Sequence, residues 1–205
     1  MKLLTSIGPN PRVVRMFLAE KGIDLPLEEV DLMGGENRQG GYLGKNPDGR
    51  LPCLELDDGS YLSEIVPICE YLEEKNPTPS LIGATAEERG ETRMWVRRID
   101  LNIVEPMVNG FRFSEGQALF TGRMTLIPQA ADDLKALAQE KLAWLDGLMA
   151  GKEWIAGDRF SFADVFLYAF VDFGGQVGQP LAESCGNLTA WRDRVAARPS
   201  AAASA

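Results

Sequence analysis

The hydrophobic and polar positions of the first 77 residues alternate between strand-like and helix-like periods. Residues 2–7 and 25–32 are apolar enough for two short strands. Between them the pattern predicts a helix from Asn10 to about Lys21, because Asn is a favoured N-cap and Pro11 fits the first helical position. The second strand should owe its burial mainly to Leu27 and Val30. The order strand–helix–strand is typical of a small α/β domain.

A second group of elements follows the glycine-rich stretch 34–49. Pro52 has no N–H, so it should stand at the first residue of a strand. Asp58-Gly59 suits a type I′ hairpin turn, which needs positive φ at both central positions. A short strand then leads into a helix with Pro67 in its first turn, where the missing N–H costs nothing. The proline-bounded loop and the helix start together suit the carboxylate end of a small peptide.

Beyond residue 85 the periodicity is helical, and no convincing strand remains. The stretch Asn76–Ser80 carries two prolines and predicts a linker. Thr85 and Glu88 predict a capping box before a long helix, and Ser161 and Asp164 predict another before a helix that is apolar all round. Pro199 should stop the last helix and leave a frayed tail. We therefore expect two domains, residues 1–77 (α/β) and residues 85–205 (all-helical).

Composition narrows the function classes. The net charge is −9 without a basic block, so we expect neither nucleic acid nor an anionic membrane as a partner. No apolar run approaches the ~20 residues of a membrane span, and no signal-peptide core precedes Gly8. Three cysteines without a C-x-x-C pair predict reduced thiols in the cytoplasm. Cys53 and Cys69 lie on apolar faces and should be buried in the core. There is no histidine, which excludes Ser-His-Asp and Cys-His nucleophiles and most zinc sites.

Three motifs carry a resemblance to a known family. They are Asn46-Pro47-x-Gly49-Arg50-Leu51-Pro52, Ser63-Glu64 before the helix Ile68–Leu72, and Ala156–Asp164. In their order and spacing the chain resembles bacterial-type cytosolic glutathione S-transferases over nearly its whole length. The resemblance implies a thioredoxin-like N-terminal domain and an all-α C-terminal domain. It also implies a cytoplasmic, detoxifying homodimer that uses glutathione as co-substrate and takes a small hydrophobic second substrate.

The resemblance also carries site residues over to this chain. Leu51 and a cis Pro52 would pair with the cysteinyl part of glutathione, and Arg50 would meet its glycyl carboxylate. Glu64 and the backbone of Ile65 would hold the γ-glutamyl end. Family members usually have Ser or Thr where this chain has Ile65, so a hydrogen bond worth roughly 1.5–3 kcal/mol is lost here unless Ser63 or a water takes over.

The residue that activates the thiol departs from the family as well. The usual Tyr position falls near Leu4-Thr5 and the usual Ser position near Gly8, and neither Leu4 nor Gly8 has a donor side chain. Thr5 and Ser6 are the other side-chain donors nearby. Bacterial members often place Cys or Asn two residues after Gly8, which makes Asn10 the first candidate and Ser6 the second. For Asn10 a plain capping role, and for Ser6 plain backbone bonding, are the structural alternatives. Met107, Phe111 and Phe113 could line a hydrophobic substrate pocket or simply fill the core.

Two functions follow from these residues. The first is an enzyme that ionises bound glutathione and transfers it to a hydrophobic electrophile, or uses it as a reductant. The second is a non-catalytic glutathione-transferase-fold module, which Ile65 and the missing Tyr or Ser activator favour. A thioredoxin-type redox protein is disfavoured because the turn from Gly8 to Pro11 contains no cysteine.

Overall fold

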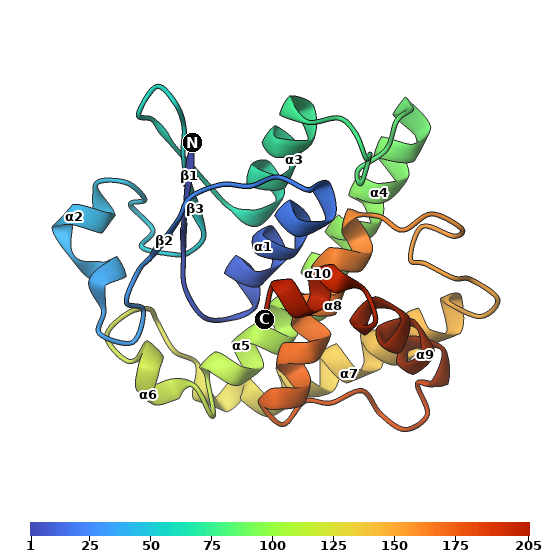
Figure 1. Ribbon diagram of the computed structural model, residues 1–205. Coiled ribbons are helices and arrows are strands. Elements are labelled where there is room, and N and C mark those ends of the chain that lie inside the picture. The colour runs from blue at the N-terminus through green and yellow to red at the C-terminus, as the bar shows by residue number, and fades with distance from the viewer. The chain divides into compact units, whose positions relative to one another are not determined.

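The computed structural model describes residues 1–205, which form two compact units. The first unit contains Met1–Leu81 together with Pro199–Ala205, and the second contains Ile82–Arg198. Figure 1 traces both along the chain. The first unit thus includes the C-terminal tail, which the sequence assigned to the helical domain. The tail is a short helix, α10 (Pro199–Ala203), with Ser200, Ala201 and Ser204 buried, so the expectation of a frayed end was wrong.

The first unit is built on a four-stranded mixed sheet in the order β2-β1-β3-β4. The strands are β1 (Lys2–Thr5), β2 (Leu27–Glu29), β3 (Cys53–Glu55) and β4 (Tyr61–Ser63). β1 pairs parallel with β2 and antiparallel with β3, and β3 pairs antiparallel with β4. The helices are α1 (Pro9–Lys21), η1 (Glu36–Arg38), α2 (Gly40–Leu43) and α3 (Ile65–Lys75). This arrangement confirms the predicted α/β domain.

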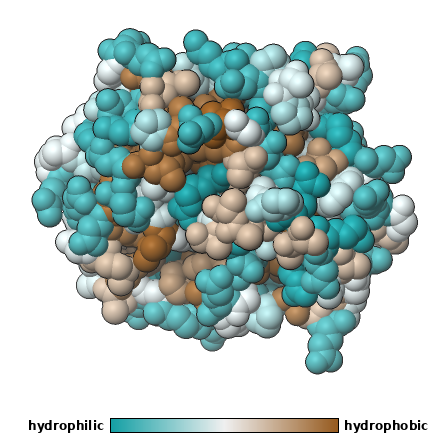
Figure 2. All heavy atoms as spheres, viewed as in Figure 1, coloured by the Kyte–Doolittle hydropathy of each residue, from teal (hydrophilic) through white to brown (hydrophobic).

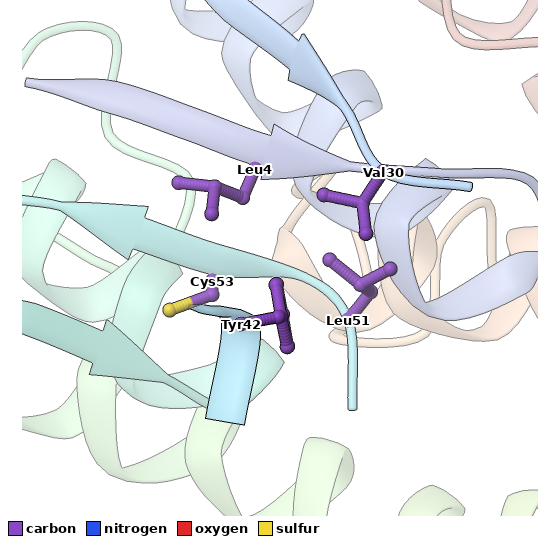
Figure 3. Packing of buried hydrophobic residues seen from close by; sticks show 5 residues of the cluster. All are labelled: Leu4, Val30, Tyr42, Leu51 and Cys53. Carbon is purple, nitrogen blue, oxygen red and sulfur yellow. The ribbon is translucent and has the colours of Figure 1, made fainter. Parts of the chain in front are cut away.

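A buried apolar cluster fixes the loop that leads into β3. Figure 3 shows five clustered side chains from β1, the residue after β2, α2, the loop before β3 and β3 itself: Leu4, Val30, Tyr42, Leu51 and Cys53. The Tyr42 hydroxyl donates to the Arg50 carbonyl at 2.6 Å, and Asn46 Nδ2 donates to the same oxygen at 2.8 Å. Both the packing and the hydrogen bonds therefore hold the backbone just before Pro52.

Three local predictions for this unit were wrong. α1 begins at Pro9 with Gly8 as N-cap, so Asn10 is the second helical residue and caps nothing. Pro9 fits the first helical position as well as Pro11 does, and that ambiguity misplaced the cap. In the hairpin, Gly59 has φ +82° but Asp58 does not have a positive φ. Leu27 is 54% exposed.

The observed hairpin loop is one residue longer than the type I′ turn that was predicted. Gly59 N–H donates to the Leu56 carbonyl at 3.1 Å, and Leu56 N–H donates to the Ser60 carbonyl at 2.8 Å. A turn closed by an i to i+3 bond and followed by a left-handed glycine is the usual three-residue hairpin with a G1 bulge. A single positive-φ residue is enough for it, and Gly59 supplies that residue.

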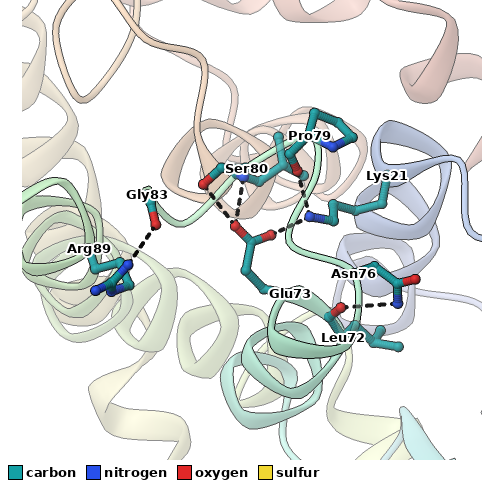
Figure 4. Close-up of polar contacts among 9 residues, drawn as sticks. Lys21, Leu72, Glu73, Asn76, Pro79, Ser80, Gly83 and Arg89 are labelled. Atoms are coloured by element: carbon teal, nitrogen blue, oxygen red, sulfur yellow. Dashed lines mark hydrogen bonds and ion pairs between the residues drawn. The ribbon is translucent and has the colours of Figure 1, made fainter. Parts of the chain in front are cut away.

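An ion pair and its neighbours anchor the end of the first unit. Lys21 Nζ lies 2.6 Å from Glu73 Oε2 and donates to the Pro79 carbonyl, and its side chain is fully buried. Glu73 also accepts from the Ser80 hydroxyl at 3.0 Å and from Leu81 N–H at 2.9 Å, as Figure 4 shows. The predicted linker is therefore held against α1 and α3 by a charged pair whose acceptors are all used.

The second unit is helical, as the sequence predicted. Its elements are α4 (Ala86–Ile99), a π-helical turn η2 (Asp100–Val104), α5 (Glu105–Arg112), α6 (Gln117–Phe120), η3 (Pro128–Ala130), α7 (Ala131–Leu148), α8 (Phe162–Gln176) and α9 (Gly186–Ala196). The capping box of Thr85 and Glu88 is present. No helix of the chain is long and apolar enough to cross a bilayer. On the face drawn in Figure 2, hydrophilic residues surround a group of hydrophobic ones.

The helix α8 is buried along most of its length and begins at a buried carboxylate. Asp164 accepts from Ser161 N–H at 2.8 Å and from the Ser161 hydroxyl at 3.0 Å. It also accepts from Ile155 N–H and from Trp191 Nε1, both at 2.9 Å. Burial raises the pKa of Asp164 above its ordinary value, while these four donors act in the opposite direction. The predicted capping box therefore also ties α8 to two other segments.

Candidate functional site

Strand register brings the sequence-predicted site segments of the first unit to one edge of the sheet. Leu4 pairs with Cys53, and Cys53 pairs with Ser63. Because these pairs are antiparallel, the chain enters β3 from Pro52 at the same edge at which it leaves β4 for Glu64. The chain also leaves β1 for α1 at this edge. Three segments that are distant in sequence thus become neighbours.

The loop before β3 presents its backbone at this edge. The Leu51–Pro52 peptide is cis, as the family resemblance implied, and both residues are buried. Arg50 is exposed and lies 2.6 Å from Asp48 across an exposed ion pair. Such pairs contribute little free energy, so the Arg50 guanidinium can exchange Asp48 for another carboxylate.

The start of α3 offers backbone donors to an anion. Glu64 is the N-cap residue, with φ +73°, and it is the only non-glycine residue with a positive φ. Its exposed side chain makes no hydrogen bond in the chain. The N–H groups of Ile65 and Val66 have no carbonyl one turn back, whereas Pro67 has no N–H at all. A positive φ outside glycine is uncommon and is often found at functional sites.

The start of α1 has few backbone N–H donors, so the side chain of Asn10 becomes important as a possible donor to a ligand. Pro9 and Pro11 flank Asn10, so only Asn10 contributes an N–H among the first three helical residues. The half-buried Asn10 side chain forms no hydrogen bond within the chain. The Ser6 hydroxyl, by contrast, is buried and donates to the Val30 carbonyl at 2.7 Å. Of the two residues proposed to donate to the thiol, only Asn10 has a side-chain donor that is not already used within the chain.

The structure also brings forward a residue that the sequence did not single out. Arg15 lies two turns into α1 and contacts Thr5 and Ser6 at the end of β1 as well as Ser204 in the tail. No periodicity or motif distinguishes Arg15 from a solvent-exposed helix charge. Its contacts depend on residues 9, 10 and 189 positions away.

The cysteine next to the site is not a nucleophile. Cys53 follows Pro52, but it is fully buried, and burial raises the pKa of its thiol to about 11. Cys69 is also fully buried, and its pKa lies well above the ordinary value for the same reason. Only the thiolate is nucleophilic, so neither cysteine is reactive near neutral pH. Both are core residues, as the sequence suggested.

The three apolar residues that could line a substrate pocket, all in the second unit, differ in their burial. Met107 and Phe113 are buried and belong to the core. Phe111 is half-buried and makes edge-to-face contacts with Phe120, at a centroid distance of 6.4 Å, and with Phe173, at 5.1 Å. Phe111 therefore remains the candidate for contact with an apolar substrate.

Comparison with protein families agrees with this architecture. Residues 7–75 match the model of the glutathione S-transferase N-terminal domain, and residues 119–199 match that of the C-terminal domain. The two matches cover more than half of the chain. The protein belongs to the glutathione S-transferase family.

Individual relatives support the same assignment. Glutathione S-transferase 2 of Saccharomyces cerevisiae is 32% identical over 200 residues, which cover 96% of this chain and 85% of the yeast protein. The crystal structure of Gtt2 from Saccharomyces cerevisiae has a TM-score of 0.92 at 30% identity and covers all of both chains. A glutathione S-transferase domain-containing protein of Marinobacter aquaeolei has a TM-score of 0.91 at 37% identity, covering 98% of this chain and 99% of that one. The maleylacetoacetate isomerase of Pseudomonas aeruginosa is 33% identical over 174 residues, 78% of this chain and 76% of that protein.

Proposed function

We propose that this protein is a glutathione transferase that binds glutathione at the shared edge of β1, β3 and β4. The observation that carries the proposal is the set of uncommitted donors at this edge: the Asn10 side chain and the N–H groups that begin α3. Leu51 and Pro52 would align the cysteinyl backbone, while Glu64 and Ile65 would hold the γ-glutamyl end. Arg50 would pair with the glycyl carboxylate.

The thiol is activated by hydrogen bonding and by the helix terminus rather than by a general base. Lowering a thiol pKa from about 8.5 to about 6.5 requires ~2.7 kcal/mol in favour of the thiolate. A helix N-terminus supplies roughly 0.3–1 kcal/mol, and up to ~2 when partly buried. One donor to a charged acceptor adds roughly 1.5–3 kcal/mol. Because the prolines leave α1 with so few N–H groups, the Asn10 amide has to supply a large share.

The second substrate is a small hydrophobic molecule. The thiolate, once formed, adds to an electrophilic carbon of that molecule or acts as its reductant. The proposed role in the cell is detoxification in the cytoplasm.

We also propose a homodimer. The family resemblance is its basis, and the mass in solution is its test. Light scattering at micromolar concentration should report twice the 22.5 kDa of one chain. A mass of a single chain would refute the dimer.

Calorimetric titration with glutathione tests the function directly. We expect one site per chain, and weaker binding by the Glu64→Gln variant, which keeps the shape of the side chain but removes its charge. Ultraviolet titration of the bound thiol should then show a pKa below that of free glutathione. Binding without a lowered thiol pKa would favour the non-catalytic module. No heat at millimolar glutathione would refute the enzyme.

A further inference from the structure

One guanidinium joins the end of β1 to the C-terminal tail. Arg15 Nη1 donates to Thr5 Oγ1 at 3.0 Å and to the Ser6 carbonyl at 2.9 Å. On its other side, Nε and Nη2 both donate to the Ser204 carbonyl, at 3.2 and 2.9 Å. The planar fork of arginine can serve acceptors on two sides at once, which an ammonium group cannot do with the same geometry.

Both ends of this bridge are firmly held. The Ser6 hydroxyl is bonded to the Val30 carbonyl, and Val30 N–H donates to the Thr5 carbonyl at 2.9 Å. In the tail, Ser204 is fully buried and its hydroxyl donates to the Ala201 carbonyl at 3.1 Å. Arg15 therefore connects the buried tail to the end of β1, where Val30 holds the Thr5 carbonyl and the Ser6 hydroxyl while Arg15 holds the Ser6 carbonyl. The β1–α1 connection continues from that carbonyl.

The segment that follows Ser6 is the one that leads to Asn10. Ile7 is 58% exposed, and Gly8 has φ +103° with open space around it. These two residues supply no packing that would fix the direction of the turn. The position of the Ser6 carbonyl, which Arg15 holds, therefore sets where the chain starts toward Asn10.

We propose that Arg15 is a positioning residue for the thiol-activating segment Ile7–Asn10, and that the Ser204 carbonyl in the tail, through Arg15, is part of the support of the glutathione site. The inference rests on the function proposed above. Without the hydrogen bonds of Arg15, the segment Ile7–Asn10 can rotate. The hydrogen bond from the Asn10 side-chain amide to the glutathione sulfur then has a poorer angle. Glutathione affinity changes little, because the loop at Pro52 and the start of α3 are untouched.

The test compares three ways of breaking the bridge. Arg15→Gln removes the fork, Arg15→Lys keeps the charge without the fork, and a variant ending at Ala203 removes the Ser204 acceptor. We expect each to raise the pKa of bound glutathione by about half a unit, which lowers the thiolate fraction and kcat about threefold below that pKa. The dissociation constant should stay within about twofold of the unmodified protein's. If Arg15→Gln does not fold, the other two variants carry the measurement.

A matched control separates positioning from general loosening of the tail. The Ser200 hydroxyl donates to Glu20 at the far end of α1, away from the site. Ser200→Ala should lower the melting temperature but leave the thiol pKa unchanged. An equal pKa shift in Ser200→Ala would overturn the positioning role. A thiol pKa in Arg15→Lys equal to that of the unmodified protein would also overturn it, because the charge of residue 15 would then suffice without the planar fork.

The two proposals can fail separately. If the unmodified protein does not bind glutathione, the proposed function fails and this inference fails with it. If it binds glutathione with a lowered thiol pKa, and the three bridge variants keep that pKa and kcat, only the inference is overturned.

Discussion

At the scale of single residues, the hydrogen bonds that each side chain already makes favour Asn10 over Ser6 as the candidate thiol activator. Ser6 already spends its hydroxyl on a buried carbonyl, so using it for a ligand would leave the Val30 oxygen without a partner. Asn10 has no such commitment. Because Gly8 rather than Asn10 caps α1, changing Asn10 does not remove a cap.

We therefore predict that Asn10→Ala raises the pKa of bound glutathione and slows conjugation at neutral pH about tenfold, which corresponds to about 1.4 kcal/mol. Affinity and melting temperature should change little. Ultraviolet titration of the bound thiolate measures the pKa. Ser6→Ala is the matched control, and we expect it to cost about 1–3 kcal/mol of stability without moving the pKa. The reverse pattern would make Ser6 the donor.

The second residue-scale prediction concerns Ile65, which is 9% exposed at the first position of α3. Ile65→Ser should tighten glutathione binding, because a hydroxyl would give the γ-glutamyl carboxylate a donor worth roughly 1.5–3 kcal/mol. Ile65→Val controls for the lost packing and should not tighten binding. Calorimetry measures both. An unchanged or larger dissociation constant in Ile65→Ser would mean that another group already fills this role.

At the scale of elements, the start of α8 depends on one buried carboxylate with four donors. Asp164→Asn keeps the shape of the side chain but turns an acceptor into a donor, so some of the four N–H and O–H groups lose their partner. At about 1–3 kcal/mol for each buried donor left unsatisfied, we expect a loss of about 3 kcal/mol or more. Urea denaturation measures it.

Asp193 provides the comparison, since its ion pair with Arg192 is exposed. Asp193→Asn should change stability by less than about 1 kcal/mol. Equal losses of unfolding free energy in the two variants would show that the four hydrogen bonds of Asp164 do not stabilise the fold more than an exposed ion pair does.

At the scale of the whole molecule, the three cysteines make the free energy of unfolding depend on pH in the alkaline range. Burial raises the thiol pKa of Cys53 to about 11 and also raises those of Cys69 and Cys185. The folded chain therefore keeps its thiol protons at pH values where the unfolded chain has lost them. The stabilisation is complete below the ordinary thiol pKa of about 8.5 and is lost as pH rises toward 11.

We accordingly expect the free energy of unfolding to fall between about pH 9 and pH 11. Denaturant titrations at several pH values measure the slope. Cys53→Ala lacks one of the titrating groups and should show a shallower fall. Identical slopes would contradict a raised pKa at Cys53.

The sequence by itself determined the features that depend on neighbours in the chain. Capping boxes, helical stripes and the proline at the start of a strand act within a few residues, so Thr85, Asp164 and Pro52 could be placed without a structure. The motifs around Pro52 and Glu64 likewise gave the family and the candidate site residues. The absence of histidine removed whole classes of catalysis at once.

Only the tertiary structure decided the features that depend on distant residues or on a choice between equal local options. Two prolines fit the first position of α1 equally well, and the fold selected Pro9. The Ser6 hydroxyl donates to the Val30 carbonyl, 24 residues away in sequence, and Arg15 donates to the Ser204 carbonyl, 189 residues away. No local preference records such contacts, because their free energy exists only once the sheet, α1 and the tail have packed together.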